Sequence, residues 1–167
     1  MISIVNNKDN LKEEDMTEIV PRVKALLINS NNEILLGYSH NDYQFPGGHV
    51  EENESLTDAL EREIKEETGI VLDLQKENFF ATSTGYWRDH PKKGINRKTI
   101  VYYFMIHTDL KPNLNNTKYT ESEIKGCYEL RYIPLKDIEK VLRENAKIYG
   151  DKFGITKEMI ELINKMK

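Results

Sequence analysis

The chain has 167 residues, of which 38% are hydrophobic and 31% charged, a composition typical of one soluble globular domain spanning residues 1–167. Its 24 basic and 28 acidic side chains give a formal net charge of −4. Nucleic-acid-binding proteins usually carry a strongly basic face, so this charge disfavours a nucleic acid partner. A single cysteine excludes an intramolecular disulfide, and no apolar run suits a membrane span or a signal peptide, so we expect a cytoplasmic protein without a membrane partner.

The first part of the chain predicts a polar arm followed by a β-hairpin. Residues 1–19 form the expected N-terminal arm, and their apolar stretch Ile2–Val5 is compatible with a short strand. The branched apolar runs Arg22–Asn29 and Glu33–Ser39 flank a Ser-Asn-Asn turn, a pattern typical of two antiparallel strands. The sequence YQFPGG then interrupts regular structure through its proline and paired glycines.

The rest of the chain predicts a mixture of helices and strands. A helix is expected to begin after Ser55, which suits the N-cap, and to end at Gly69, which suits the left-handed position after a helix. Apolar β-branched and aromatic runs predict three strands, at Phe79–Trp87, Thr99–Ile106 and Cys127–Ile133. Pro134 is expected to open a helix that reaches about Ala146, and a C-terminal helix is expected within residues 150–167. Because these elements do not alternate strictly, we predict an α/β fold in which helices enclose a mixed β-sheet.

The helix after Ser55 carries carboxylates where its packing face should be apolar. Side chains advance by about 100° per residue along an α-helix. On that geometry the apolar residues form one stripe, made of Leu56, Ala59, Leu60 and Ile64. Glu63 and Glu67 fall inside this stripe, and Glu66 flanks it. A carboxylate on a packing face loses several kcal/mol of hydration unless another group compensates, so these three residues need an explanation.

A divalent metal ion explains the carboxylates better than an ion pair. Arg62 is the only cation near them on that half of the helix, and one guanidinium cannot neutralise three carboxylates. Their spacing puts them within reach of one ion or a small cluster, and hard oxygen ligands favour Mg²⁺ or Mn²⁺ over Zn²⁺. Mg²⁺ sites of this kind usually complete their shell with water and substrate phosphate, which indicates phosphorus chemistry. Gly47 and Gly48 would let the backbone approach such an ion or a phosphate closely.

The same residues form a pattern that resembles the Nudix hydrolase family. The Nudix box reads G-x5-E-x7-R-E-U-x-E-E-x-G-U, where U is a bulky aliphatic residue. Every defined position is filled here, by Gly48, Glu54, Arg62, Glu63, Ile64, Glu66, Glu67, Gly69 and Ile70. The hairpin before the box and the late strand and helix also look like the family's frame, so the resemblance covers about residues 20–146.

The resemblance implies a Nudix-type α/β/α sandwich with a central mixed β-sheet. It also implies Mg²⁺- or Mn²⁺-dependent hydrolysis of a nucleoside diphosphate linked to a moiety X, with metal ions that activate the attacking water. By match to the motif, the expected metal ligands are Glu63, Glu66 and Glu67, with the Gly47 carbonyl as a further candidate. The expected catalytic group contains Glu63, Glu66 and Arg62. Glu54 and Gly48 are expected to give structural support, Glu54 through an ion pair with Arg62 that orients the ligand helix.

The general base of the reaction is open between several acids. Glu63 is one candidate, and Glu121 or Glu123 from the later loop is another. Glu129, in the expected late strand, is a candidate for an additional metal ligand. For each of the three acids outside the box, an exposed position without a catalytic role is the alternative.

Substrate selection is expected to involve residues outside the box. The basic segment from Arg88 to Lys98 could grip a distal phosphate through Arg88 or Arg97, and a solvated connection is the alternative. Tyr86 lies sixteen residues after Ile70, as in members of the family that hydrolyse diadenosine polyphosphates. Packing of Tyr86 against the protein is the alternative to stacking on a base.

The sequence therefore predicts a pyrophosphohydrolase with a small, nucleotide-derived substrate. Candidate substrates are dinucleoside polyphosphates, nucleotide sugars and non-standard nucleoside triphosphates. The alternative function is that of a Nudix domain that senses a nucleotide without cleaving it, although such domains usually lose glutamates of the box. The oligomeric state stays open, and a homodimer is one alternative.

Overall fold

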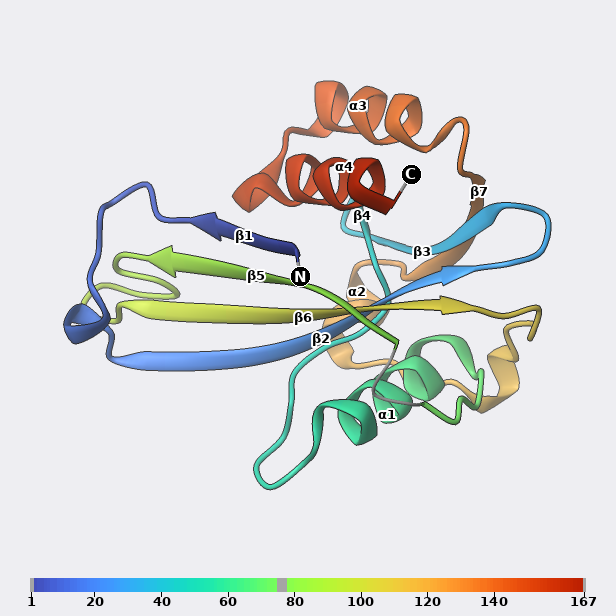
Figure 1. Ribbon diagram of the computed structural model, residues 1–167, viewed down its shortest axis with the longest axis horizontal. Helices are drawn as coiled ribbons and strands as arrows, with labels where there is room; N and C mark the ends of the chain where they lie inside the picture. Colours follow the sequence, from blue (N-terminus) through green and yellow to red (C-terminus); the bar gives the residue numbers. More distant parts are fainter. Residues whose placement is uncertain (1, 75–77, 167) are drawn as a thin grey trace.

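In the computed structural model of the protein, which describes residues 2–74 and 78–166, a β-sheet separates two layers of helices (Figure 1). Helix α1 (Leu56–Thr68) packs on one face of the sheet, and helices α3 (Ile138–Tyr149) and α4 (Ile155–Met166) pack on the other. The predicted α/β/α sandwich with a central mixed sheet is confirmed. None of the helices in these two ranges has the length and apolar character needed to cross a membrane.

Within the described residues the sheet contains seven strands. They are β1 (Ile2–Asn6), β2 (Glu18–Ile28), β3 (Glu33–Ser39), β4 (Asp42–Gln44), β5 (Phe79–Trp87), β6 (Arg97–His107) and β7 (Glu129–Pro134). Their order is β1-β5-β6-β2-β3-β4, and β7 pairs with β3. The pairs β1–β5 and β2–β6 are parallel and the other pairs are antiparallel, so the sheet is mixed. The antiparallel pairing of β2 with β3 confirms the predicted hairpin.

The N-terminal segment joins the sheet instead of forming a polar arm. Strand β1 is the parallel neighbour of β5, and β2 begins at Glu18 rather than at Arg22. A short 3-10 helix, Glu13–Asp15, lies between the two strands. Ile2 and Ile4 pack against buried core residues, and this burial holds the segment on the sheet although most of its residues are polar. The prediction of an arm over residues 1–19 was therefore wrong, apart from its short strand.

The C-terminal half follows the prediction with shifted boundaries. Pro134 ends β7 instead of opening a helix, and α3 begins at Ile138. A proline is tolerated at the end of an edge strand because no neighbouring strand needs its missing N–H. The short strand β4 and the short helix α2 (Glu121–Lys125) were not predicted, since elements of this length carry too few residues for a hydrophobic period to show.

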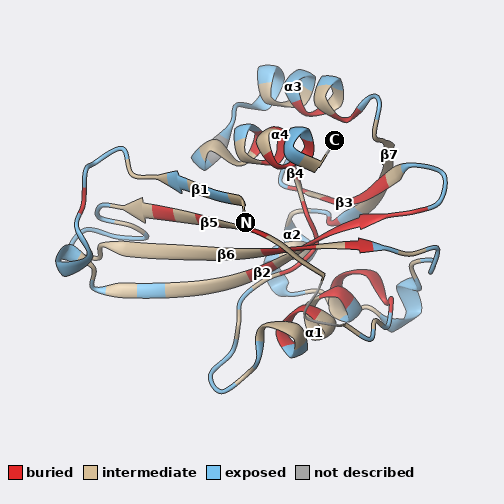
Figure 2. Ribbon diagram, viewed as in Figure 1, coloured by how far each residue is buried: buried red, intermediate tan, exposed pale blue. Residues whose placement is uncertain are grey.

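Each face of the sheet buries its own hydrophobic cluster (Figure 2). Successive side chains of a strand point to opposite faces, so Val23 and Ala25 of β2 pack towards α1, whereas Leu26 and Ile28 pack towards α3 and α4. Three apolar residues of the predicted helical stripe are fully buried on the sheet, namely Ala59, Leu60 and Ile64. The stripe therefore does set which face of α1 meets the sheet.

Candidate active site

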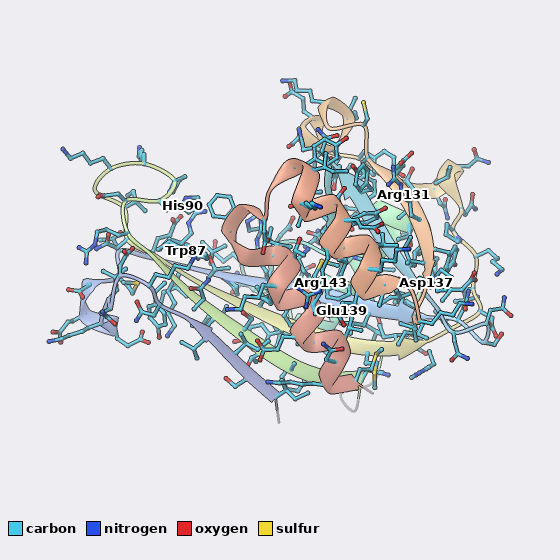
Figure 3. The ribbon with its side chains drawn as sticks, turned by 90° about the horizontal axis from the view of Figure 1, so that it is seen from above. Trp87, His90, Arg131, Asp137, Glu139 and Arg143 are labelled. Atoms are coloured by element: carbon cyan, nitrogen blue, oxygen red, sulfur yellow. The ribbon has the colours of Figure 1, made fainter. Side chains whose placement is uncertain are left out.

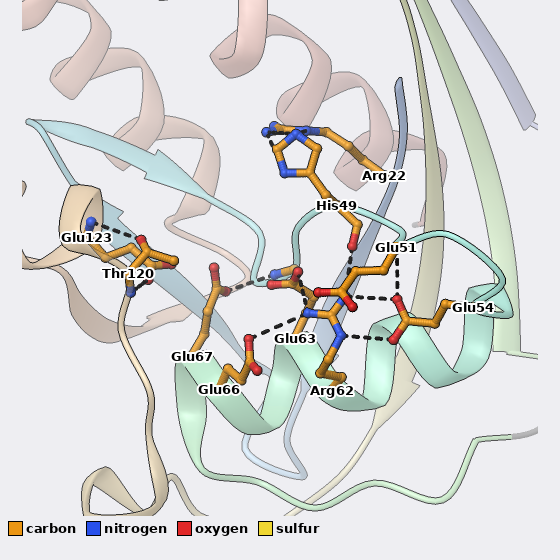
Figure 4. Close-up of polar contacts among 11 residues, drawn as sticks. Arg22, His49, Glu51, Glu54, Arg62, Glu63, Glu66, Glu67, Thr120 and Glu123 are labelled. Carbon is orange, nitrogen blue, oxygen red and sulfur yellow. Dashed lines mark hydrogen bonds and ion pairs between the residues drawn. The ribbon is translucent and has the colours of Figure 1, made fainter. Parts of the chain in front are cut away.

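The segment from Phe45 to Val50 lies beside β2, where a neighbouring strand would otherwise be. Strand β2 pairs with β3 over two residues only. Nearer the N-terminal end of β2, the Val23 amide donates a hydrogen bond to the Gly48 carbonyl at 3.0 Å. The Ala25 amide donates to the Pro46 carbonyl at 2.9 Å. These bonds hold the paired glycines against the sheet, directly beside the acidic helix α1 (Figure 4).

Both glycines occupy places where a side chain would clash. Gly47 has a φ of 129°, and a Cβ on it would lie 2.2 Å from the Val23 carbonyl oxygen. A Cβ on Gly48 would lie 2.4 Å from the Glu63 carboxylate. Other groups of the protein therefore approach both glycines closely, and the group that approaches Gly48 is a carboxylate of α1. The approach of this backbone to an ion or a phosphate stays a prediction.

Glu67 is the most deeply buried of the three stripe carboxylates. Its residue is 5% exposed, and its Oε2 accepts a hydrogen bond from the Gly47 amide at 2.8 Å and one from the Tyr128 hydroxyl at 3.0 Å. Burial raises the pKa of Glu67 to about 8, against the opposing effect of the nearby Lys24 ammonium. The buried carboxylate is thus bonded to the glycine loop through Gly47. It is also bonded to Tyr128, the residue that precedes β7.

Replacement of Tyr128 by phenylalanine is expected to destabilise the fold. The Tyr128→Phe variant leaves a buried carboxylate oxygen with one donor fewer, which should lower the free energy of unfolding by about 1–2 kcal/mol. Urea unfolding of the metal-free protein would measure this change. Tyr149→Phe is the matched control because Tyr149 is exposed, and equal stability of the two variants would contradict the importance of the bond to Glu67.

Arg62 connects the loop with the carboxylates of the helix (Figure 4). Its Nε and Nη2 each donate to one oxygen of Glu54 at 2.9 Å, and Nη2 also donates to the His49 carbonyl at 2.9 Å. Its Nη1 donates to Glu63 Oε1 at 2.9 Å and lies 3.5 Å from Glu66 Oε2. The pKa of Arg62 is raised above its usual value, and the bidentate bond to Glu54 is the largest cause. The ion pair expected between Glu54 and Arg62 is therefore present.

The carboxylates match a hard metal ion in chemistry, and in this structure Arg62 and the glycine loop keep them apart. Glu63, Glu66 and Glu67 supply only oxygen donors, the kind that Mg²⁺ and Mn²⁺ prefer. Across residues 2–74 and 78–166, no three His, Cys, Asp or Glu side chains come close enough together to hold a metal ion. The reason is Arg62, whose Nη1 holds both Glu63 and Glu66 while Glu67 turns to the glycine loop.

A second cation, Lys24, lies near the carboxylates, and the sequence pattern did not predict it there. It belongs to β2, and its Nζ donates to the Phe45 carbonyl at 2.8 Å. Desolvation lowers the pKa of Lys24 to about 8, although Glu67 acts in the opposite direction. Arg62 is therefore not the only compensating charge, because the sheet contributes a cation from a strand that is distant from the helix in sequence.

The three acids outside the box lie in different places. Glu123, on α2, accepts a hydrogen bond from the Thr120 amide at 2.5 Å, and its charge acts on both Glu63 and Glu67, which places it near the carboxylates (Figure 4). Glu121 is highly exposed and pairs with Lys125 at 2.6 Å. Glu129 pairs with Arg131, which stacks on Tyr38 over the face of the sheet opposite α1. Of these acids, the structure brings only Glu123 to the box.

The residues considered for substrate binding are also divided. The Tyr86 hydroxyl donates to Glu13 at 2.5 Å, and Lys98 lies over its ring, so Tyr86 packs against the N-terminal segment. Arg97 belongs to β6 and donates to Glu18 at 2.7 Å, while Arg88 is exposed at the start of the β5–β6 loop. The basic loop is therefore shorter than predicted.

A cavity of about 250 Å³ lies on the sheet face opposite α1, between the strands and the start of α4. Arg97 lines it, and Trp87 lines it in place of its neighbour Tyr86. Arg22 and Lys24 of β2 also line the cavity, and the Arg22 Nη2 lies 3.0 Å from His49 Nε2. The cavity therefore adjoins the glycine loop and, through it, the carboxylates of α1.

Comparison with known families agrees with this arrangement. The NUDIX domain family matches residues 19–153, which include α1, the glycine loop and most of the sheet. The chain belongs to this family. The match extends slightly beyond the span of about residues 20–146 that the sequence pattern indicated.

One curated relative resembles part of this NUDIX chain. An 8-oxo-dGTP diphosphatase of Buchnera aphidicola subsp. Acyrthosiphon pisum (strain APS) is 46% identical over 43 residues, which are 26% of this chain and 33% of that relative. The match thus spans about a third of the curated relative's length.

Solved structures of three proteins share the NUDIX fold with this chain. A MutT protein from Methanosarcina mazei Go1 has a TM-score of 0.51 and 22% identity, over 74% of this chain and 82% of its own. A C. elegans Ap4A hydrolase binary complex has a TM-score of 0.51 and 19% identity, over 88% and 94%. A bifunctional NMN adenylyltransferase/ADP ribose pyrophosphatase from Francisella tularensis, complexed with AMP and a Mn ion, has a TM-score of 0.54 and 21% identity, over 89% and 42%.

Three residues near the NUDIX carboxylates and the cavity escaped the sequence analysis. Lys24 carried a signal, since a lysine inside the apolar run of β2 must either reach solvent or meet an acid. Trp87 follows from strand alternation once Ser83 and Gly85 are known to line the cavity, because every second residue shares a face. Tyr128 carried no local signal, since its partner Glu67 is 61 positions away.

Proposed function

We propose that the protein is a hydrolase that depends on Mg²⁺ or Mn²⁺ and cleaves a pyrophosphate bond in a nucleoside diphosphate linked to a moiety X. The observation that carries this proposal is the group of three carboxylates on α1, held against the glycine loop of a NUDIX domain. Carboxylates are costly to bury unless a cation is to be bound, and here they are concentrated beside the backbone of the glycine loop.

Each side chain of the site has a role that its contacts support. Glu63, Glu66 and Glu67 would hold the metal after turning towards it from their present contacts with Arg62 and Gly47, and the Gly47 carbonyl is a further candidate because its residue contacts Glu67. When bound, Mg²⁺ or Mn²⁺ supplies neutralisation of charge on the phosphate oxygens and lowers the pKa of coordinated water. Arg62 is held on Glu54, and this pair fixes the orientation of the ligand helix.

Two carboxylates can accept the proton of the attacking water. Glu63 is half-buried and lies against Gly48, and Glu123 reaches the same region from α2. Glu121 and Glu129 are less suited to this role, since one is paired in solvent and the other lies towards the opposite face. The variant Glu123→Gln therefore distinguishes the two candidates, because it should lower turnover only if Glu123 is the base.

Several substrate classes are compatible with this site. The similar proteins are named as a diphosphatase of 8-oxo-dGTP, a hydrolase of Ap4A and a pyrophosphatase of ADP ribose, and all three substrates contain a pyrophosphate bond. We therefore place dinucleoside polyphosphates, ADP-ribose, nucleotide sugars and oxidised deoxynucleoside triphosphates in one panel of candidates.

Incubation of this panel with the protein and Mg²⁺ or Mn²⁺ is expected to give nucleotide products with at least one compound and none in chelator. Because water attacks phosphorus, hydrolysis in ¹⁸O-labelled water should place the label on a phosphate product. Ion-exchange chromatography and mass spectrometry would measure both results. Label on a carbon atom, or equal turnover in chelator, would contradict the proposed mechanism.

The alternative is a NUDIX domain that senses a nucleotide without cleaving it. It predicts saturable binding of a panel compound in the presence of metal, with the compound recovered intact. The retention of every glutamate of the box favours the enzyme over this alternative.

A further inference from the structure

The cavity beside α4 has a polar group at its wall that the reaction on α1 does not use. Glu158 of α4 lines the cavity together with Ser83 of β5 and Tyr103 of β6. The Ser83 hydroxyl donates to Glu158 Oε2 at 2.7 Å, and the Tyr103 hydroxyl donates to Oε1. Burial, and to a smaller extent the negative charge of Glu158, raises the pKa of Tyr103 well above its usual value. The Tyr103 hydroxyl therefore keeps its proton and donates it in this hydrogen bond.

This arrangement leaves a pair of acceptors at one wall of the cavity. A carboxylate has about four acceptor positions on its two oxygens. The two hydroxyl donors occupy one position on each oxygen and fix the plane of the carboxylate. Among the hydrogen bonds of residues 2–74 and 78–166, these two leave one acceptor position on each oxygen, and the two oxygens belong to the same carboxylate. A ligand group that satisfies both must present two adjacent N–H or O–H donors.

The other walls of the cavity suit a flat ring. Trp87 and Phe153 meet edge to face with ring centroids 5.7 Å apart, and His90 lies 5.4 Å from Phe153. Figure 3 shows Trp87 and His90 at the β5–β6 loop, beside the start of α4. The volume of about 250 Å³ is below the roughly 300–1,000 Å³ of pockets that take drug-sized ligands, so it suits a single ring system.

A line of contacts connects this cavity with the carboxylates of α1. Arg22 lines the cavity and bonds to the ring of His49 at 3.0 Å. The backbone carbonyl of His49 accepts from Arg62, which in turn holds Glu63 (Figure 4). A ligand with its ring in the cavity would therefore pass its phosphates over Arg22 towards the site of hydrolysis.

We propose that the cavity binds the base of a nucleotide and that Glu158 is a specificity-determining residue, which selects a base with two adjacent N–H donors, as guanine has. Guanine presents N1–H and the N2 amino group side by side. Adenine places the N1 lone pair next to its amino group, and hypoxanthine lacks the amino group. Carboxylates accept such donors well, and a site that is built for them rejects a base that leaves an acceptor unpaired. The inference rests on the proposed function only in taking a nucleotide as the ligand.

The single tryptophan of the chain makes this proposal testable without catalysis. Trp87 lines the cavity, so its fluorescence should change when GMP, IMP or AMP binds. In titrations without metal, we expect GMP to bind about 10-fold more tightly than IMP or AMP. In Glu158→Gln, the affinity for GMP should fall about 10-fold and become similar to that for IMP. The matched control is Glu161→Gln, since Glu161 lies on the same helix and pairs with Lys165 at 2.8 Å.

Other outcomes overturn the proposal. If the wild-type protein binds AMP or IMP as tightly as GMP, Glu158 does not select the base, whether or not Glu158→Gln folds. An equal loss of affinity for all three nucleotides in Glu158→Gln would show that the carboxylate only balances the cations of the cavity. Since the titration needs neither metal nor turnover, preferential binding of GMP by a protein that hydrolyses no panel compound would refute the proposed function and leave this inference intact.

Discussion

Replacement of Glu66 by glutamine is expected to lower kcat about 100-fold or more and to leave the fold intact. The Glu66 side chain is 31% exposed, and its contact with Arg62 is a long one of 3.5 Å, so the change should cost less than about 1 kcal/mol of stability. A neutral amide, however, is a much weaker ligand for a hard divalent ion than a carboxylate. The rate on the best panel substrate at saturating Mg²⁺, together with the melting temperature, would measure both effects.

The same variant should also lose its response to metal. Mn²⁺ that binds only the folded protein raises its melting temperature, and this rise should be smaller in Glu66→Gln than in the wild type. Glu52→Gln serves as the control, because Glu52 is an exposed acid in the loop before the same helix. Turnover at the parental rate by Glu66→Gln would show that Glu66 is not a metal ligand.

Replacement of Gly47 by alanine is expected to have the largest effect on stability. The new methyl group would lie 2.2 Å from a backbone carbonyl of β2, which cannot move aside cheaply, and the φ of 129° disfavours any side chain. The combined clash and strain should cost roughly 2–4 kcal/mol in the free energy of unfolding. Urea unfolding monitored by circular dichroism would measure this loss.

The neighbouring change, Gly48→Ala, separates folding from function. Its methyl group would meet the end of the Glu63 side chain at 2.4 Å, and a flexible side chain can turn away. Stability should therefore change by less than about 1 kcal/mol, whereas kcat should fall at least about 10-fold because Glu63 is displaced. If Gly48→Ala unfolds as readily as Gly47→Ala, or keeps full activity, the contact between Gly48 and Glu63 does not position the site.

The acidic helix could be predicted from the sequence because its signals are local. Its start at Leu56, its end at Thr68 and the burial of Glu67 agree with the cap residues and the helical period. The arrangement of the carboxylates could not be predicted in the same way. Arg62 holds Glu63 and Glu66, and this pairing depends on where the loop carrying Glu54 returns to the helix.

The substrate side of the protein needed the tertiary structure. Tyr86 was one candidate substrate contact, with packing against the protein as the alternative, and it bonds to Glu13 while Trp87 lines the cavity. Which residue of β5 points inward depends on how β5 pairs with β1 and β6, and a shift by one residue would exchange the two faces. The pattern of the strand alone does not contain that register.

The sequence by itself determined the family, the position of α1 and the three carboxylates that a metal would need. These features depend on residues within 23 positions of one another, from Gly48 to Ile70, where helical geometry fixes the spacing of side chains. Only the tertiary structure decided that Lys24 and Tyr128 approach Glu67 and that Glu158 closes a cavity with Ser83 and Tyr103. Such contacts join strands and helices that are far apart in sequence, so they arise from packing and strand register, which no local pattern specifies.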